Sequence, residues 1–186
     1  MNLNVFVGTL TDDKMPIFSR GDETFYLSHL DCRGVKLPVV VSQYYFEAYT
    51  GKRVECTAFM RTTRVVPEKK RSLFSYLYAV LIRPVGEDVD DDRRVEICGR
   101  ITELSDIDLT PDNRVKREIK LEYQVQFGNV CCETVSCRCF DEVARITLSL
   151  EVGDLIKVSG YMTGGRRSLR LIVKELQKEE ILAEVH

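Results

Sequence analysis

The residues best suited to metal or nucleophile chemistry are seven cysteines and two histidines. Four cysteines, Cys131, Cys132, Cys137 and Cys139, lie within nine residues, which raises the question of a zinc site. Their spacing differs from the C-x₂-C pairs of zinc ribbons and knuckles. Cys137 and Cys139 also point to the same side of a predicted strand, where a free cysteine acts as a small hydrophobic residue. The sequence therefore predicts buried thiols, with no metal and no cofactor.

The sequence offers no recognisable catalytic motif. Neither His29 nor His186 accompanies a nucleophile motif, and no Walker-type phosphate loop is present. The acidic residues cluster in a linker and in loops rather than at spaced strand ends. We therefore expect a binding protein without enzymatic activity.

The composition is that of an ordinary globular protein, with 44% apolar and 30% charged residues. No apolar run approaches the roughly 20 residues needed to cross a bilayer, and the first residues do not resemble a signal peptide. The cysteines are then more typical of free thiols than of disulfides. The expected location is the cytoplasm, without membrane contact.

Charge divides the chain into two parts around an acidic stretch. Residues 86–92 (GEDVDDD) carry five carboxylates and no base, which predicts a solvated linker between domains at 1–85 and 93–186. Residues 1–85 have 12 Lys and Arg against 8 Asp and Glu, a net charge of +4. Residues 93–186 have 15 against 16, a net charge of −1. The first part is modestly basic, although the whole chain has a net charge of −2.

The two parts repeat one another. Residues 7–11 (VGTLT) match 98–102 (CGRIT) at an offset of 91, and 51–60 (GKRVECTAFM) match 153–162 (GDLIKVSGYM) at an offset of 102. A repeat of this kind indicates one architecture used twice. The change of offset places about 11 extra residues in the second copy, before its helix ends.

Each repeat has the element order of three strands, one short helix and two strands. The period-two and β-rich segments predict strands at 2–11, 24–31, 35–42, 54–63 and 72–83, with a helix at 42–49. The second set is 95–104, 115–127, 132–140, 155–163 and 168–176, with a helix at 141–150 that Asp141 would cap. This is the order of the OB fold, a five-stranded Greek-key barrel. We expect an all-β chain of two tandem OB-fold barrels with short helices; a helix-free β-sandwich is the main alternative.

Three segments of the second repeat resemble the core signature of bacterial single-stranded DNA-binding proteins: 95–101 (VEICGRI), 139–145 (CFDEVAR) and 151–160 (EVGDLIKVSG). The tandem layout is similar to the two-barrel form found in some Firmicutes. The resemblance implies a protein that coats single-stranded DNA in replication, recombination or repair. The chain lacks tryptophan, on which that family stacks bases, so stacking would fall to Phe and Tyr. It also lacks the family's acidic C-terminal tip, so recruitment of replication proteins through such a tip is not expected.

Binding of single strands without sequence preference needs aromatic faces for bases and cations for phosphates. Side chains alternate along 134–140, which places Val135, Cys137 and Cys139 in the core and Arg138 and Phe140 outside. Phe140 also matches the stacking phenylalanine of the family. The alternative is a phenylalanine packed under the helix.

Further candidates in the second barrel are basic. They are Arg114, Lys116, Arg117 and Lys120 on one strand, and Arg166 and Arg167 in the last hairpin. The alternative for the strand is a solvated face carrying Glu118 and Glu122.

The first barrel contributes a basic hairpin and an aromatic stripe. The candidates are Arg61, Arg64, Lys69, Lys70 and Arg71, followed by Phe74 and Tyr76. An aromatic stripe of period two also fits a core or a contact between protomers. For Phe59 and Tyr161, at equivalent repeat positions and on the expected outer face of the fourth strand, packing between barrels or between protomers is the favoured role.

Two functions follow from these residues. The first is a single-stranded DNA-binding protein, with RNA as a further ligand of OB folds, acting as a homodimer that brings four barrels together. The second is a replisome-like or primosome-like adaptor that acts mainly through protein contacts. The weak net charge and the missing tryptophans favour the adaptor.

Overall fold

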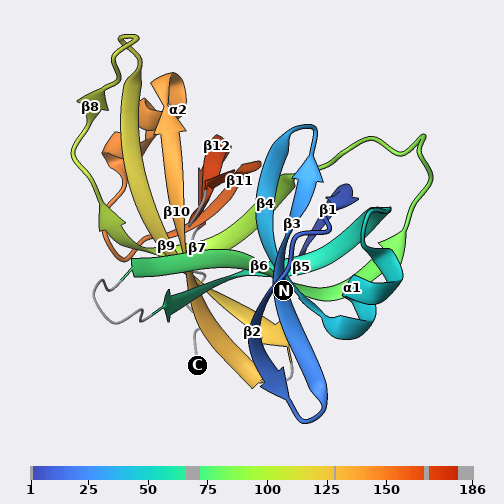
Figure 1. Cartoon of the computed structure of the whole chain (residues 1–186). Helices are drawn as coiled ribbons and strands as arrows, with labels where there is room; N and C mark the ends of the chain where they lie inside the picture. The colour runs from blue at the N-terminus through green and yellow to red at the C-terminus, as the bar shows by residue number, and fades with distance from the viewer. Residues whose placement is uncertain (1, 66–71, 128, 166–167, 180–186) are drawn as a thin grey trace. The chain divides into compact units, whose positions relative to one another are not determined.

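A computed structural model describes residues 2–65, 72–127, 129–165 and 168–179, and the side chains at 63–65, 72–73, 127, 129 and 165 are not described. The strands form two six-stranded sheets (Figure 1), and each sheet closes into a five-stranded barrel with one added outer strand. Both barrels contain one short α-helix after the third strand of the barrel. The prediction of two tandem OB-fold barrels is confirmed, and the sandwich alternative is wrong.

The first barrel is built from β1 (Asn4–Leu10), β3 (Glu23–Cys32), β4 (Val35–Ser42), β5 (Arg53–Val65) and β6 (Ser72–Pro84). Helix α1 (Gln43–Tyr49) joins β4 to β5, and β2 (Met15–Arg20) adds to the outer side of β3. The strand order is β1-β5-β6-β4-β3-β2, and β1 also pairs with β3. The pairing of β4 with β6 is parallel and gives the barrel its Greek-key connection.

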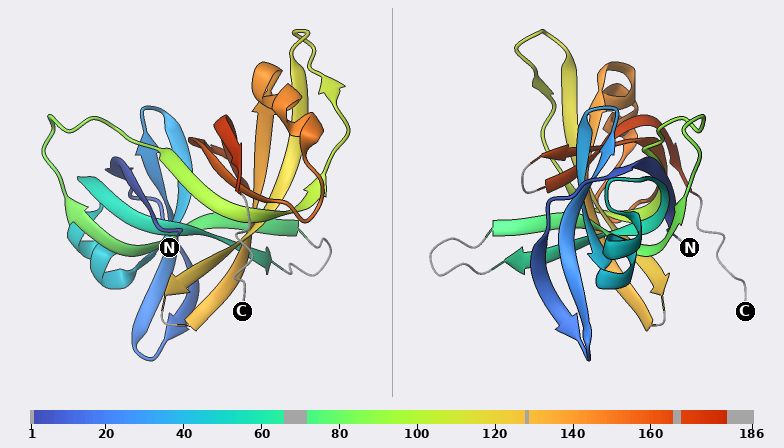
Figure 2. Two further views of the ribbon diagram at one scale, coloured as in Figure 1. Left: turned by 180° about the vertical axis from the view of Figure 1, so that it is seen from behind. Right: turned by 45° about the vertical axis from the view of Figure 1, so that its right-hand side comes forward.

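The second barrel repeats this arrangement with β7 (Arg94–Leu104), β9 (Val115–Phe127), β10 (Asn129–Phe140), β11 (Leu155–Gly165) and β12 (Ser168–Lys178). Helix α2 (Asp141–Ile146) and the short 3₁₀ turn η1 (Thr147–Ser149) follow β10, and β8 (Asp108–Leu109) adds to β9. Strands β9 and β10 have 13 and 12 residues, against 10 and 8 in β3 and β4. About half of the extra residues of the second repeat therefore lengthen this hairpin (Figure 2), and most of the others lie between β10 and β11.

Gly8 and Gly99 occupy equivalent positions where each barrel closes. A Cβ atom on Gly8 would lie 2.6 Å from the carbonyl oxygen of Asp31, and one on Gly99 would lie 2.7 Å from that of Glu122. Backbones approach this closely only where no side chain stands between them. The glycine of the repeated VGTLT and CGRIT segments therefore permits the first strand to cross the second one in both barrels.

Alternating apolar side chains fill the barrels. The first contains Leu10, Leu30, Leu37 and Val54, and the second contains Ile97, Ile119, Leu121, Ile156 and Leu171; all are essentially inaccessible to solvent. The helices cover the barrels with Phe46 of α1 and Ala144 of α2. Burial of this kind supplies the main stabilising free energy of such small barrels.

Two local expectations differ from the structure. Asp141 does not cap α2: the N-cap residue is Phe140, and Asp141 is the first helical residue, with a φ of 51°. The Asp141 carboxylate instead accepts a hydrogen bond from Arg114 Nε at 2.9 Å. Strands β2 and β8 were also not expected, because both are short additions to a barrel edge and bury little apolar surface.

The acidic stretch is exposed to solvent over residues 86–90, as expected, but residues 91 and 92 contact β1 and β5. Val7 and Asp92 exchange two backbone hydrogen bonds of 2.8 and 3.1 Å, and the Asp91 carboxylate lies 2.5 Å from the Arg53 guanidinium. The Asp91 side chain is only 10% exposed. Contacts divide the chain into two compact units, Leu3–Arg94 with Met162–Leu169, and Met1–Asn2 with Val95–Tyr161 and Arg170–His186. The acidic stretch thus lies within the first unit.

Candidate nucleic-acid interface

The outer face of β9 and β10 brings together most of the predicted site residues of the second barrel. In the antiparallel register, Phe140 lies opposite Lys116, Arg138 opposite Glu118, and Ser136 opposite Lys120. Val135, Cys137 and Cys139 point to the other side and are buried. The predicted core side of this strand is confirmed, and Arg138 and Phe140 lie on the opposite face.

Phe140 ends β10 and is partly buried. The Arg114 guanidinium lies over its ring, 4.6 Å from the ring centroid, and also contacts the Asp141 carboxylate at 2.9 Å. A guanidinium in this position is attracted to the ring as a cation–π contact. The ring therefore has one side in the protein and one side covered by a partly exposed arginine.

The remaining outer-face cations form ion pairs within the chain. Arg138 Nε lies 2.9 Å from Glu118 Oε1, Lys116 Nζ lies 3.6 Å from the same oxygen, and Lys120 Nζ lies 2.8 Å from Glu103. All of these side chains remain partly exposed to solvent. The described outer face of β9 and β10 therefore carries a network of ion pairs, with the ring of Phe140 at the end of β10.

Arg117 lies apart from the other predicted cations. It donates hydrogen bonds to the backbone carbonyls of Ser105 at 2.8 Å and Thr147 at 2.6 Å, and its backbone lies opposite the buried Cys139. The guanidinium therefore connects the end of β7 to the 3₁₀ turn after α2. Because side chains alternate along a strand, Arg117 lies on the opposite face from Lys116 and Lys120. This alternation could have separated Arg117 from the other cations in the sequence, where all four were grouped by their charge.

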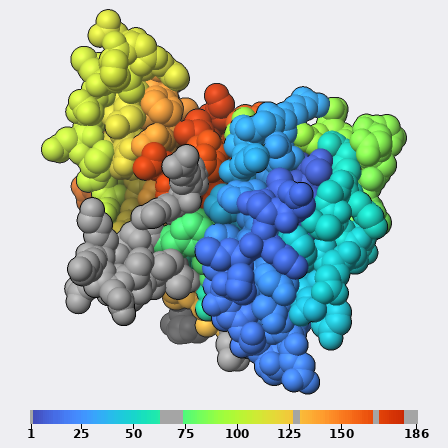
Figure 3. Space-filling view, in the orientation of Figure 1, coloured from blue at the N-terminus to red at the C-terminus, as the bar shows by residue number. Residues whose placement is uncertain are grey.

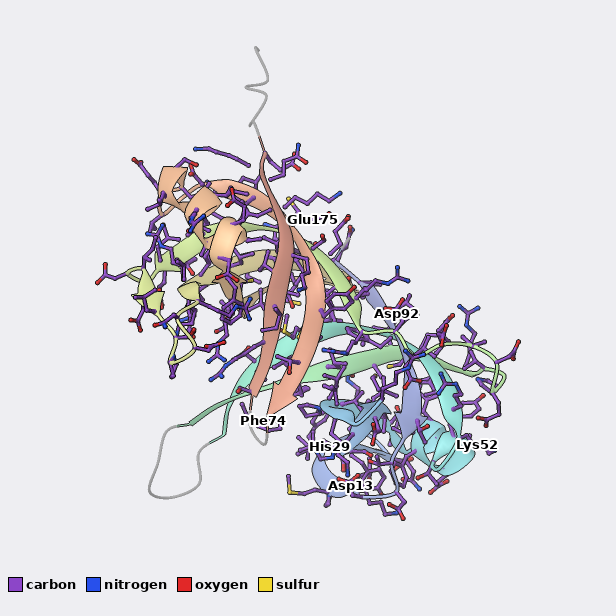
Figure 4. All side chains as sticks on the ribbon, turned by 90° about the horizontal axis from the view of Figure 1, so that it is seen from above. Asp13, His29, Lys52, Phe74, Asp92 and Glu175 are labelled. Carbon is purple, nitrogen blue, oxygen red and sulfur yellow. The ribbon has the colours of Figure 1, made fainter. Side chains whose placement is uncertain are left out.

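The aromatic stripe of β6 belongs to an apolar cluster on the first barrel. Tyr76 is 5% exposed and packs with Phe25 and Val40, while Phe74 and Tyr78 lie partly buried against them. The Phe74 and Tyr76 ring centroids are 5.7 Å apart. Burial raises the pKa of the Tyr78 hydroxyl. Of the two candidates, Phe74 (labelled in Figure 4) is the more exposed, and the buried Tyr76 packs beside it.

A series of neighbouring rings, Phe18, Phe25, Tyr78 and Phe59, extends this cluster to the surface, and we call it the ring ladder. Phe18 of β2 stacks on Phe25 at 4.7 Å with 16° between the planes, Phe25 is 6.1 Å from Tyr78, and Tyr78 is 5.4 Å from Phe59. The Arg61 guanidinium lies 5.9 Å from the Tyr78 ring. Phe18 is 38% exposed. Phe18 is not among the residues predicted from the sequence, because β2 has no buried face and therefore leaves no periodic signal.

The β2–β3 hairpin that carries Phe18 is held at its base by polar contacts. His29 Nδ1 and Asp13 Oδ2 are 2.6 Å apart (Figure 4), and the Ser28 hydroxyl donates to the carbonyl oxygen of Thr11 at 3.0 Å. The tip of the hairpin projects from the first barrel in the space-filling view (Figure 3). All six residues of β2 are exposed, and Phe18 contacts the first barrel through its stacking on Phe25.

Several predicted cations lie outside the described residues. These are Lys69, Lys70, Arg71, Arg166 and Arg167, together with the side chain of Arg64, whose backbone is in β5. Their assignment to phosphate contacts stays a prediction.

The cysteines are all free thiols. Burial raises the pKa of the Cys139 thiol to about 12 and that of Cys137 well above its usual value, so both stay protonated near neutral pH. A metal ligand would have to be a thiolate. Within the described ranges, no three His, Cys, Asp or Glu side chains gather as metal ligands do, and no helix is long and apolar enough to cross a membrane.

Comparison with known proteins gives matches in structure alone. No family model and no curated protein sequence matches the chain. The wild-type single-stranded DNA-binding protein of Thermus aquaticus superposes with a TM-score of 0.77 at 16% identity, over 97% of this chain and 93% of that one. A deletion mutant of the same protein gives a TM-score of 0.77 over 99% and 98%. The chain therefore has the two-barrel OB fold seen in the single-stranded DNA-binding protein of Thermus aquaticus.

Proposed function

We propose that this protein binds single-stranded DNA without sequence preference and protects it during replication, recombination or repair in the cytoplasm. The observation that carries the proposal is the outer face of β9 and β10. That face aligns Phe140, Arg138, Lys116 and Lys120 along one strand pair. Rings that stack on bases beside cations that follow phosphates are the two components such binding needs. The role is one of binding, without catalysis.

The fold supports the proposal at the level of architecture. The Thermus aquaticus protein with the same two-barrel fold is a single-stranded DNA-binding protein by name. The outer faces of the second and third barrel strands are where OB folds bind oligonucleotides. In this chain, those strands are β9 and β10 in the second barrel and β3 and β4 in the first, where Phe25 of β3 stacks on Phe18 of the added strand β2.

A labelled oligo-dT titrated by fluorescence anisotropy at two salt concentrations tests the function. Binding should weaken as salt rises, because each neutralised phosphate releases a bound counterion. An oligo-rU competitor of equal length separates DNA from RNA preference. Absence of binding at low salt would overturn the proposal.

Replacing Phe140 by Leu should weaken oligo-dT binding by about 1–3 kcal/mol, because leucine keeps apolar volume but offers no ring to a base. Unfolding free energy should fall by less than about 1.5 kcal/mol, as for other swaps between large apolar residues. Phe140→Tyr is the matched control and should keep both properties. If Phe140→Leu keeps full affinity, or if it unfolds the protein, the ring serves packing instead.

We further propose a homodimer, which brings four barrels together and raises the effective concentration of binding sites along one strand. Sedimentation equilibrium should then report twice the chain mass of 21.4 kDa. A mass of one chain at micromolar concentration would contradict the dimer but not the binding proposal.

The second candidate is an OB-fold adaptor that contacts other replication proteins. The observation that favours it is that the described outer-face cations of β9 and β10 are already paired with carboxylates. The oligo-dT titration separates the two functions, because an adaptor predicts no salt-dependent binding of DNA.

A further inference from the structure

Four of the cations assigned to phosphate on the second barrel, Arg114, Lys116, Lys120 and Arg138, share one property. Each is held by a carboxylate of the same chain: Lys116 and Arg138 by Glu118, Lys120 by Glu103, and Arg114 by Asp141. A DNA phosphate that approaches this face meets ion pairs rather than free cations. Binding must therefore exchange one anion for another.

Glu118 differs from the other carboxylates because it serves two cations at once. Its Oε1 lies 2.9 Å from Arg138 Nε across the strands and 3.6 Å from Lys116 Nζ along β9. Arg138 is directly opposite Glu118 in the register, and Lys116 is opposite Phe140. The carboxylate thus lies between two cations of the outer face, one of which, Lys116, is opposite Phe140 in the register.

We propose that Glu118 sets the affinity of this surface by occupying the position of a backbone phosphate between Arg138 and Lys116. The inference rests on the proposed binding of single-stranded DNA. A carboxylate and a phosphate present similar oxygens to a guanidinium, so one can replace the other. The Glu118 side chain is 42% exposed and can turn into solvent when displaced.

Exchange of the Glu118 carboxylate for a phosphate changes the folding free energy little and can therefore be reversible. Ion pairs between solvent-exposed side chains contribute little to folding stability, so losing this one does not threaten the barrel. The displaced carboxylate, however, stays near the incoming phosphate and repels it. It also attracts a cation from solution, which offsets part of the counterion release. Wild-type binding should therefore be weaker and less sensitive to salt than the number of cations suggests.

Glu118→Gln removes the competing charge while keeping the shape of the side chain. We expect oligo-dT to bind about five-fold more tightly at low salt, the effect of one unit charge at about 4 Å in water. The slope of log K against log salt should steepen by about 0.7, the value for one additional phosphate on a single strand. Thermal unfolding should be nearly unchanged.

Glu122→Gln is the matched control. Glu122 lies on the same strand and the same face, but opposite Thr134 on β10 rather than opposite Arg138. The Glu122→Gln variant has the same change of net charge as Glu118→Gln. It should improve binding by less than about two-fold, because screening by salt weakens the repulsion between a phosphate and a more distant carboxylate. In an Arg138→Gln background, the gain from Glu118→Gln should shrink, since residues in one ion-pair network are not additive.

The outcomes separate the two proposals. Wild-type binding without any gain in Glu118→Gln, or an equal gain in Glu122→Gln, overturns the role of Glu118 and leaves the proposed function in place. Absence of oligo-dT binding by both the wild type and Glu118→Gln at low salt overturns the proposed function and the inference with it.

Discussion

At the scale of single residues, the thiols divide by burial rather than by sequence spacing. Cys32, Cys56, Cys137 and Cys139 are buried in the barrels, and burial raises the pKa of Cys32, Cys56 and Cys139 to about 12. Cys132 and Cys98 are exposed, and Cys131 is intermediate. Vicinal Cys131 and Cys132 differ because adjacent side chains of a strand point to opposite faces.

Thiol labelling of the native protein should follow this division. With an aromatic disulfide reagent at pH 8, Cys132 should react fastest and Cys98 more slowly, because burial and the Glu179 charge raise the pKa of the Cys98 thiol. The four buried thiols should react only after unfolding. Peptide mapping by mass spectrometry identifies the sites, and rapid native labelling of Cys137 would contradict the assignment of that strand face.

At the scale of elements, the acidic stretch at 86–92 makes contacts with arginines that its run of like charges does not predict. The sequence predicts a solvated linker from five neighbouring carboxylates, but three of them meet arginines: Asp90 pairs with Arg33, Asp91 with Arg53 and Asp92 with Arg94. Hydrogen bonds from Arg94 hold the pKa of Asp92 below its usual value. Contacts place the acidic stretch in the unit that contains Leu3–Arg94. The domain boundaries at 85 and 93 remain a proposal.

Asp91→Asn should destabilise the protein by about 3 kcal/mol, because it leaves the Arg53 guanidinium, whose side chain is 15% exposed, without its charged partner. Asp90→Asn is the control, since the Asp90 side chain is 88% exposed and an exposed pair contributes at most about 1 kcal/mol. Urea unfolding compares the two variants. Equal midpoints would show that the Asp91 pair does not hold the stretch in place.

The elements that sequence could predict are those with buried side chains. All ten barrel strands and both helices were predicted, and β4 and β9 have the predicted bounds. β9 alternates between buried and more exposed side chains, whereas β4 is a β-rich segment that is buried at its last six residues. β2 and β8 carry no core side chains and leave no such periodic signal. Ion pairs such as Arg138 with Glu118 depend on the register between strands, and the sequence of one strand does not contain it.

At the scale of the whole chain, the two barrels share a topology but present different surfaces. The third strand of the barrel ends in Phe140 in the second repeat and in Ser42 in the first, and both are the N-cap residue of the helix that follows. Among the described residues, the outer face of β9 and β10 thus carries one ring, Phe140, among ion pairs, whereas the first barrel carries the ring ladder that begins with Phe18 on the added strand β2. One topology used twice therefore presents two different combinations of stacking and charge.

The hydrogen bonds between Val7 and Asp92 have a consequence for solubility. β1 pairs with β3 only at Thr9 and Leu10, so the preceding residues present a strand edge on that side. Such an edge is a template on which another chain can add a strand and begin to aggregate. The backbone of Asp92 occupies both the N–H and the C=O group of Val7. At Val7, the acidic stretch that suggested a spacer therefore leaves no backbone group on this edge for the strand of another chain to pair with.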